Sequence, residues 1–276
     1  MKLIIICKAI MLMLLLELVR IRSWKAYLGM AFFGYALPIR QVDLLNLVPM
    51  LVSVSLYLGF AFAINNCYDV DTDIVSGKKI NPVASGAMGE KRAKMISYAI
   101  AASGLLFTWT SLRDGFVIYS LMTLLAYAYS APPRLKGLPA FDMISHGLFF
   151  GSLLFLFGAS VSGSLSSEHA VLASSVFLYS CLFELKNHIE DFEHDRRAGI
   201  KTTAVRLGER RKTAFSMLCA VHILLLIFLV SQKGSAMLYL PALSGLAMMI
   251  PEDWLFNNFR AVNLFTILVY AVHIVI

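Results

Sequence analysis

Charged residues are scarce in this chain: Asp, Glu, Lys and Arg make up 15% of its 276 residues, against about 25% in a typical soluble domain. Hydrophobic residues make up 59%, and the mean hydropathy is +0.74. So few charges exclude an ordinary water-soluble fold of this size, because too few polar side chains remain to cover its surface. The composition therefore indicates a membrane protein.

Cysteine is also rare, and its four residues form no CxxC pair. The sequence thus predicts neither a disulfide framework nor a cysteine-based metal site. The net charge of +7 is not gathered into a basic run interleaved with aromatic residues, as a nucleic-acid groove requires. We expect no nucleic-acid partner, and no segment indicates an obligatory protein partner.

Long apolar runs are what the chain has instead. Runs of about 18 or more apolar residues are typical of membrane-spanning helices. We therefore expect an all-α, polytopic membrane protein with about nine transmembrane helices in one bundle. The candidate spans are residues 23–39, 44–64, 93–112, 115–130, 141–163, 169–188, 213–231, 236–251 and 259–276.

The segment 1–19 stands apart from these spans. It is apolar, but Lys8 and Glu17 interrupt it, and no small-residue cleavage site follows it. We expect a surface-lying or loosely inserted helix, or an extension from an upstream start site, rather than a cleaved signal. Residues 20–276 are then a single transmembrane domain.

The basic residues lie unevenly about the predicted spans. The N-terminal flank and the loops after even-numbered spans hold almost all of them, while the opposite side holds only Arg40, Arg113 and Lys233. Lys and Arg collect on the cytoplasmic side of membrane proteins. We therefore expect the even-numbered loops to face the cytoplasm.

Two acidic stretches, "NNCYDVDTD" at 65–73 and "NHIEDFEHD" at 187–195, are copies of one motif. An offset of 122 residues aligns them on the pattern N-x3-D-x-[DE]-x-D-x3-G-x-K-x3-V-x2-G. Four predicted spans separate the copies, so both motifs fall at the cytoplasmic ends of their helices. The offset places Asn65, Asp69 and Asp73 on Asn187, Asp191 and Asp195.

Asn, Asp and Asp at i, i+4 and i+8 share one helical face, so each copy can turn a row of oxygen atoms toward the other. Such oxygens suit hard divalent ions, above all Mg²⁺, which bridges carboxylates to substrate phosphate. Basic residues on the same side fit a diphosphate. With an apolar interior beneath, the site predicts a prenyl diphosphate as substrate. The basic candidates are Arg22, Lys79, Arg134, Lys136 and Lys201.

These stretches resemble a known family. "NNCYDVDTD" followed by "SGKKINPVASG", and "DFEHDRRAGIKTTAVRLG", are similar to the two aspartate motifs of the UbiA superfamily of intramembrane prenyltransferases. "YAYSAPPRLK" at 127–136 resembles its Tyr-containing loop, and "RIRSW" at 20–24 resembles its first-helix Arg segment. The resemblance covers about residues 20–276.

The resemblance implies Mg²⁺-dependent transfer of a prenyl group, through an allylic cation, from a prenyl diphosphate to a lipophilic acceptor in the membrane. Asp69, Asp73, Asp191 and Asp195 would be catalytic, holding Mg²⁺ with Asn65 and Asn187. Arg22, Lys79, Arg134 and Lys136 would steady the leaving diphosphate, and Tyr68, Tyr129 and Ser130 would contact the cation or prenyl chain. The chain departs from the family at two positions, where Asn66 replaces Asp and Asn81 replaces Arg.

Three readings remain open at this point. A quinone precursor or a glycerol-phosphate lipid could serve as prenyl acceptor. The same fold could transfer another group, such as phosphoribose, because a fold does not fix a reaction. A membrane transporter would use the carboxylates as an ion path, although they cluster at one face rather than along the spans.

Overall fold

The computed structural model describes residues 2–37, 43–75, 77, 80–163, 165–232 and 252–275. This part of the chain contains helices and no strand, which confirms the all-α prediction. The longer helices are α1 (Lys2–Leu18), α2 (Lys25–Tyr35), α3 (Leu44–Tyr68), α5 (Glu90–Ser111), α6 (Phe116–Ser130), α8 (Leu153–Ser162), α9 (Ser167–Glu190), α12 (Arg211–Ser231) and α15 (Phe259–Val275).

Short helices connect or extend these. α7 (Phe141–His146) continues through a π-helical turn, η4 (Gly147–Ser152), into α8. The remaining short elements are η1 (Ile21–Ser23), α4 (Val70–Val75), η2 (Arg113–Gly115), η3 (Leu135–Gly137), α10 (Phe192–Arg197), α11 (Thr203–Leu207), η5 (Gly208–Arg210) and α14 (Glu252–Asn257).

Three helical stretches are both long and apolar enough to cross a membrane: Leu44–Tyr68, Phe141–Ser162 and Thr203–Ser231. Helix Phe259–Ile274 is apolar but shorter. The expected span 236–251 lies outside the described residues. The count of nine spans therefore stays a prediction.

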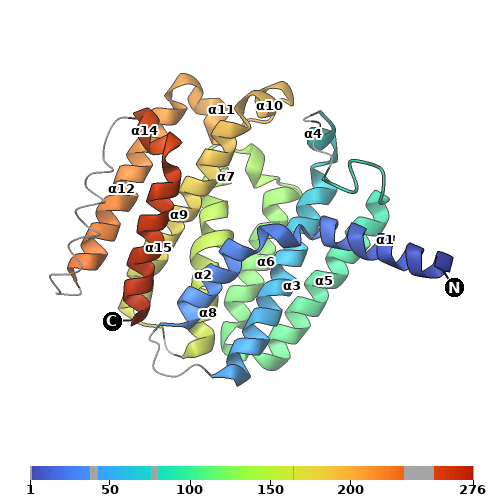
Figure 1. The fold of residues 1–276 in the computed structure, drawn as a ribbon, viewed down its shortest axis with the longest axis horizontal. Coiled ribbons are helices and arrows are strands. Elements are labelled where there is room, and N and C mark those ends of the chain that lie inside the picture. Colours follow the sequence, from blue (N-terminus) through green and yellow to red (C-terminus); the bar gives the residue numbers. More distant parts are fainter. Residues whose placement is uncertain are drawn as a thin grey trace.

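The long helices lie side by side as a bundle (Figure 1), with α2 against α8, α3 against α5, and α9 against η4 and α12. Helix α1 runs crosswise to the bundle near one end. Its Leu18 is buried in a small cluster with Cys67 and Met88. Helices α4 and α10, which carry the ends of the two acidic motifs, lie at the same end of the bundle.

Glycines allow α2 and α8 to touch along their backbones. A Cβ on Gly34 would lie 1.9 Å from the carbonyl oxygen of Phe155, and one on Gly158 would lie 1.9 Å from that of Ala31. Small residues at helix contacts are typical of membrane bundles, where close packing replaces the hydrophobic effect. This contact sets α2 beside the interior of the bundle, into which Tyr27 projects.

Polar caps define where α3 and α9 begin. The Asp43 side chain accepts a hydrogen bond from the Leu45 amide at 2.9 Å, and Ser166 and His169 form a reciprocal capping box. Both helices end at an aspartate of the repeated motif: Asp69 follows α3 and Asp191 follows α9. The apolar helices thus end where the acidic residues begin.

Candidate active site

The backbone of each motif stays helical across the end of its long helix. The Asp69 amide donates to the Asn65 carbonyl at 3.0 Å, and the Asp73 amide donates to the Asp69 carbonyl at 2.8 Å. The second motif repeats this pattern, with 2.8 Å from Asp191 to Asn187 and 2.9 Å from Asp195 to Asp191. These i to i−4 bonds keep each triplet on one helical face.

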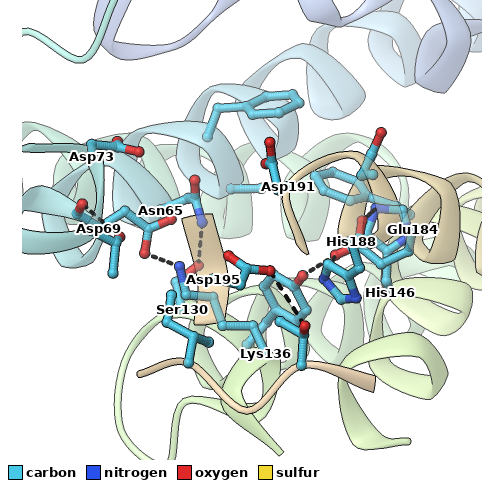
Figure 2. Close-up of a pocket in the computed structure, with 18 of the residues that line it drawn as sticks. Asn65, Asp69, Asp73, Ser130, Lys136, His146, Glu184, His188, Asp191 and Asp195 are labelled. Carbon is cyan, nitrogen blue, oxygen red and sulfur yellow. Dashed lines mark hydrogen bonds and ion pairs between the residues drawn. The ribbon is translucent and has the colours of Figure 1, made fainter. Parts of the chain in front are cut away.

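Both triplets line a single cavity of about 450 Å³. Figure 2 shows Asn65, Asp69 and Asp73 on one side, with Asp191 and Asp195 across from them. Two acidic helix ends 122 residues apart in sequence therefore meet at one site. Asn187, the remaining member of the triplets, also lines this cavity.

The loop after α6 brings positive charge to this cavity. Lys136 forms an ion pair with Asp69, and the guanidinium of Arg134 lies 3.4 Å from the same carboxylate. Ser130 also lines the cavity, and its hydroxyl accepts a hydrogen bond from the Asn65 side chain at 3.4 Å. Lys136 and Ser130 thus line the cavity, and Arg134 reaches its edge through Asp69.

Other predicted residues lie elsewhere. Arg22 is exposed in η1 and does not line the cavity, whereas Arg20 does. Arg20 is in the left-handed conformation at φ 48°, and its side chain reaches Asn66 and lies 3.8 Å from Asp73. Lys201 is exposed beside the cavity rather than in its wall.

Tyr68 also points away from the cavity: its ring lies under the Lys94 ammonium, 4.5 Å from the ring centroid. Tyr68 directly precedes Asp69, so it lies on a different helical face from Asn65 and Asp69 and points toward α5. Tyr129, in contrast, lines the cavity. Lys79 lies outside the described residues.

The two departures from the family motif are joined in the structure. Asn81 donates to the Asn66 carbonyl at 2.9 Å and to Asp73 Oδ2 at 2.8 Å. Asn66 is fully buried. Its side-chain oxygen accepts a hydrogen bond from the Arg20 guanidinium, and its side-chain nitrogen donates to the Leu18 carbonyl at 2.8 Å. Asn81 therefore holds the first motif in place. Arg20 supplies a guanidinium beside Asn66 and Asp73.

The electrostatics fit a cation bound between the motifs. Burial raises the pKa of Asp195, although His188 opposes the rise, and the neighbouring Asp191 adds to it. A bound cation would relieve this cost because it favours the charged form. Thr202 donates to Asp195 at 3.3 Å. The amide and carboxylate oxygens facing the cavity are ligands that Mg²⁺ prefers.

Within the described parts of the chain, no three His, Cys, Asp or Glu side chains converge closely enough to enclose a metal ion by themselves. An ion between the triplets would thus need further oxygen ligands. Mg²⁺ commonly takes such ligands from water and from substrate phosphate. The donor set therefore fits a metal that is completed by a phosphorylated substrate.

Beyond the first triplet, aromatic rings line part of the cavity. Phe62 precedes Asp69 by seven residues in α3, about 10 Å deeper along the helix axis. It packs on Tyr27 and Phe150 at centroid distances of 5.8 and 5.5 Å, and Phe149 completes this wall. The site thus has an acidic and basic end at the triplets and aromatic rings beyond the first triplet.

Several polar residues that line this cavity were not assigned from the sequence, among them Arg20, His146, Glu184 and His188. A signal for Glu184 was present, because it is a charged residue inside an apolar span and lies seven residues before Asp191, on the same helical face. His146 carries a weaker signal, since it lies near the start of its expected span at 141–163.

Residues 27–264 match the UbiA prenyltransferase family, and the chain belongs to that family. Digeranylgeranylglyceryl phosphate synthase of Methanosarcina mazei is 32% identical over 224 residues, covering 78% of this chain and 72% of that protein. The digeranylgeranylglyceryl phosphate synthase of Sulfolobus acidocaldarius is 29% identical, and the match covers 71% of this chain and 70% of that protein. Lycopene elongase/hydratase of Haloarcula japonica is 31% identical, and the match covers 62% of this chain and 59% of that protein.

Solved structures share the fold. A UbiA homolog from Archaeoglobus fulgidus bound to GPP and Mg²⁺ superposes with a TM-score of 0.73 at 24% identity, covering 94% of this chain and 99% of that one. A structure described with digeranylgeranylglyceryl phosphate synthase in membranes has a TM-score of 0.76 at 18% identity, covering 95% and 98%. The protein is therefore a membrane prenyltransferase by family, which confirms the resemblance found in its motifs.

Proposed function

We propose that this enzyme transfers an isoprenyl group from a prenyl diphosphate to a lipophilic acceptor and requires Mg²⁺. The observation that carries the proposal is the division of one cavity between a charged end, formed by both acidic triplets with Lys136 and Arg20, and the rings of Phe62, Phe149 and Phe150 beyond it. A substrate with a diphosphate head and a hydrocarbon tail has the same division. The relatives named for prenyl transfer and the homologous structure with GPP and Mg²⁺ support this assignment.

Asn65, Asp69, Asp73, Asn187, Asp191 and Asp195 would hold Mg²⁺. When bound, the metal neutralises the diphosphate and makes it a better leaving group. Lys136, Arg134 and Arg20 stabilise the charge that develops on the diphosphate as its bond to carbon breaks. The rings of Tyr27 and Phe150 would face the prenyl chain of the substrate and shield the allylic cation from water.

We infer a glycerol-phosphate lipid as acceptor, since relatives from Sulfolobus acidocaldarius, Korarchaeum cryptofilum and Methanosarcina mazei are named digeranylgeranylglyceryl phosphate synthase. A quinone precursor remains the competing acceptor. Release of diphosphate by the purified protein, measured with prenyl diphosphates of several chain lengths, should require both Mg²⁺ and a lipid acceptor. Ion flux through proteoliposomes that is abolished by Asp69→Asn, with no prenyl transfer, would instead support a transporter.

We also infer nine membrane spans arranged as two related halves, with residues 1–19 outside this domain and the active site toward the cytoplasm. Matched contacts support the repeat. Arg20 contacts Asn66, and the residues 122 positions further on, Asp142 and His188, lie 3.4 Å apart. The uneven distribution of Lys and Arg supports the orientation. Labelling of single cysteines placed at residues 92 and 114 from either side of the membrane tests it.

A further inference from the structure

A second polar cluster lies deeper in the cavity than the acidic triplets. Glu184 precedes Asp191 by seven residues in α9 and therefore lies about 10 Å further along the helix axis. Tyr129, His146 and His188 surround it, and all four residues line the cavity. Figure 2 shows Glu184 beside both histidines, apart from the first acidic triplet. None of these four residues is among those proposed above to hold the metal or the diphosphate.

The Glu184 carboxylate is held from three sides. The Tyr129 hydroxyl donates a hydrogen bond to Oε1, and Nε2 of His188 lies 3.1 Å from the same oxygen. Nε2 of His146 lies 3.4 Å from Oε2. Behind His188, the buried Asp142 lies 3.4 Å from Nδ1. A buried carboxylate needs such neighbours to stay charged, and here they also fix its orientation.

This arrangement determines what Tyr129 can do for a ligand. A tyrosine hydroxyl has one hydrogen to donate and lone pairs that accept. Because the hydrogen of Tyr129 is directed to Glu184, its oxygen can only accept a hydrogen bond from a molecule in the cavity. Tyr129 thus favours a ligand that presents a donor, such as a hydroxyl group, at this depth.

The two halves of the chain differ at this level. The 122-residue offset aligns Phe62 with Glu184 in the sequence, and both residues line the cavity. Phe62 adds a ring that packs on Phe150, whereas Glu184 adds a carboxylate bonded to Tyr129, whose own ring packs on Phe149 at a centroid distance of 5.1 Å. The rings around Phe62 suit the prenyl chain, and the Tyr129 hydroxyl held by Glu184 suits a hydroxyl group of the acceptor.

We propose that Tyr129 and Glu184 remove the proton of the acceptor, and that the acceptor attacks through a hydroxyl group. This inference rests on the proposed prenyl transfer. The bond from the prenyl carbon to the diphosphate oxygen breaks, and its electron pair leaves with the diphosphate. A lone pair of the acceptor oxygen forms the new carbon–oxygen bond, which gives a protonated ether.

The protonated ether passes its proton to the Tyr129 oxygen while Tyr129 passes its own hydrogen to Glu184. Glu184 ends as a neutral carboxylic acid, and the ether and the diphosphate are the products. A stabilised carboxylate is basic enough for this step, because a protonated ether is a far stronger acid than a carboxylic acid. His146 and His188 position the carboxylate and do not need to contact the substrate.

Tyr129→Phe and Glu184→Gln test the inference, because both keep the side-chain shape. Geranylgeranyl diphosphate and geranylgeranylglyceryl phosphate serve as probes. We expect either variant to slow single-turnover ether formation by at least about 100-fold, the usual effect of losing a general base. The dissociation constant for the prenyl diphosphate should change less than threefold. The double variant should be no slower than the single variants, since both residues serve one path.

Glu90→Gln makes the same chemical change at a residue that is exposed and paired with Lys94, and it should match the wild type. Glu184→Asp should recover part of the lost rate. If Tyr129→Phe and Glu184→Gln both form the ether within threefold of the wild-type rate, the inference is overturned while prenyl transfer stands. Faster prenyl transfer to a polyene than to the hydroxyl probe would overturn it in the same way. A parallel loss of prenyl diphosphate binding would show a structural role and overturn it too. Wild-type protein that cleaves no prenyl diphosphate would overturn the proposed function itself.

Discussion

Lys136 forms an ion pair with Asp69 across the cavity, which joins the loop after α6 to the first acidic motif. Its side chain is only 11% exposed, so this charge is largely removed from water. An ammonium in this position neutralises Asp69 before substrate arrives and lies ready for the diphosphate afterwards. The loop after α6 is therefore part of the site as well as a connection between helices.

Replacing Lys136 by Met keeps the apolar stem and removes the charge. We expect kcat/KM for the prenyl diphosphate to fall about 100-fold, because one positioned group on a developing anion commonly contributes this much. Steady-state kinetics on purified protein provides the measurement. Lys94→Met, at a lysine paired with Glu90 at 2.6 Å, should stay within twofold of wild type. A Lys136→Met enzyme with an unchanged kcat/KM would remove this residue from the site.

Arg20 and Arg22 form a matched pair for mutation, since they are two residues apart but face different surroundings. Arg20→Gln should weaken prenyl diphosphate binding about tenfold or more, because the guanidinium is a strong partner for phosphate. Arg22→Gln should change it less than twofold, since Arg22 is exposed. Direct binding of a non-cleavable prenyl diphosphate analogue distinguishes them. The reverse order of effects would show that the bound state uses Arg22.

Metal and substrate should bind together rather than independently. If the triplets hold Mg²⁺ through a shared diphosphate, the metal and an analogue added together should raise the thermal unfolding temperature more than the sum of their separate effects. Saturation at 100 times Kd stabilises the folded state by about 2.7 kcal/mol. Chelation should abolish the shift, and Asp191→Asn should reduce it. Purely additive shifts would argue against a bridging metal.

Asn81 should matter for stability as well as for the site. It is 2% exposed and bonds both Asp73 and the Asn66 carbonyl. Asn81→Ala should lower the free energy of unfolding by about 2 kcal/mol, because a hydrogen bond to a charged group is lost and a buried carbonyl is left without this donor. Thermal unfolding in detergent measures this. Asn46→Ala, which removes an exposed bond to Asp43, should cost much less, and equal losses would contradict the assignment.

Much of the site follows from local sequence. Asn, Asp and Asp spaced four residues apart share a face in any helix, and the helical bonds through Asp69 and Asp191 preserve that spacing. An even number of predicted crossings returns the chain to the same side, so the two copies were expected to meet. These inferences depend only on helix geometry and on the length of apolar runs, which the sequence states directly.

Other features depend on tertiary contacts that the sequence does not state. The left-handed conformation of Arg20 turns the chain between α1 and η1, so Arg20 rather than Arg22 enters the cavity. The sequence makes Tyr68 and Tyr129 equal candidates for contact with the prenyl chain, yet Tyr68 packs beneath Lys94. His146 becomes part of the cavity because a π-helical turn follows it and α9 packs against that turn.

The central claim is that the two acidic triplets act together in prenyl transfer. Its most direct test uses purified protein, a labelled prenyl diphosphate, Mg²⁺ and a membrane lipid extract, with the labelled product identified by mass spectrometry. Asp69→Asn and Asp191→Asn should each reduce labelled lipid by more than about 100-fold with helical content unchanged, while Asp114→Asn, exposed in η2, should match wild type. Labelled lipid at wild-type rates from either cavity variant would contradict the account.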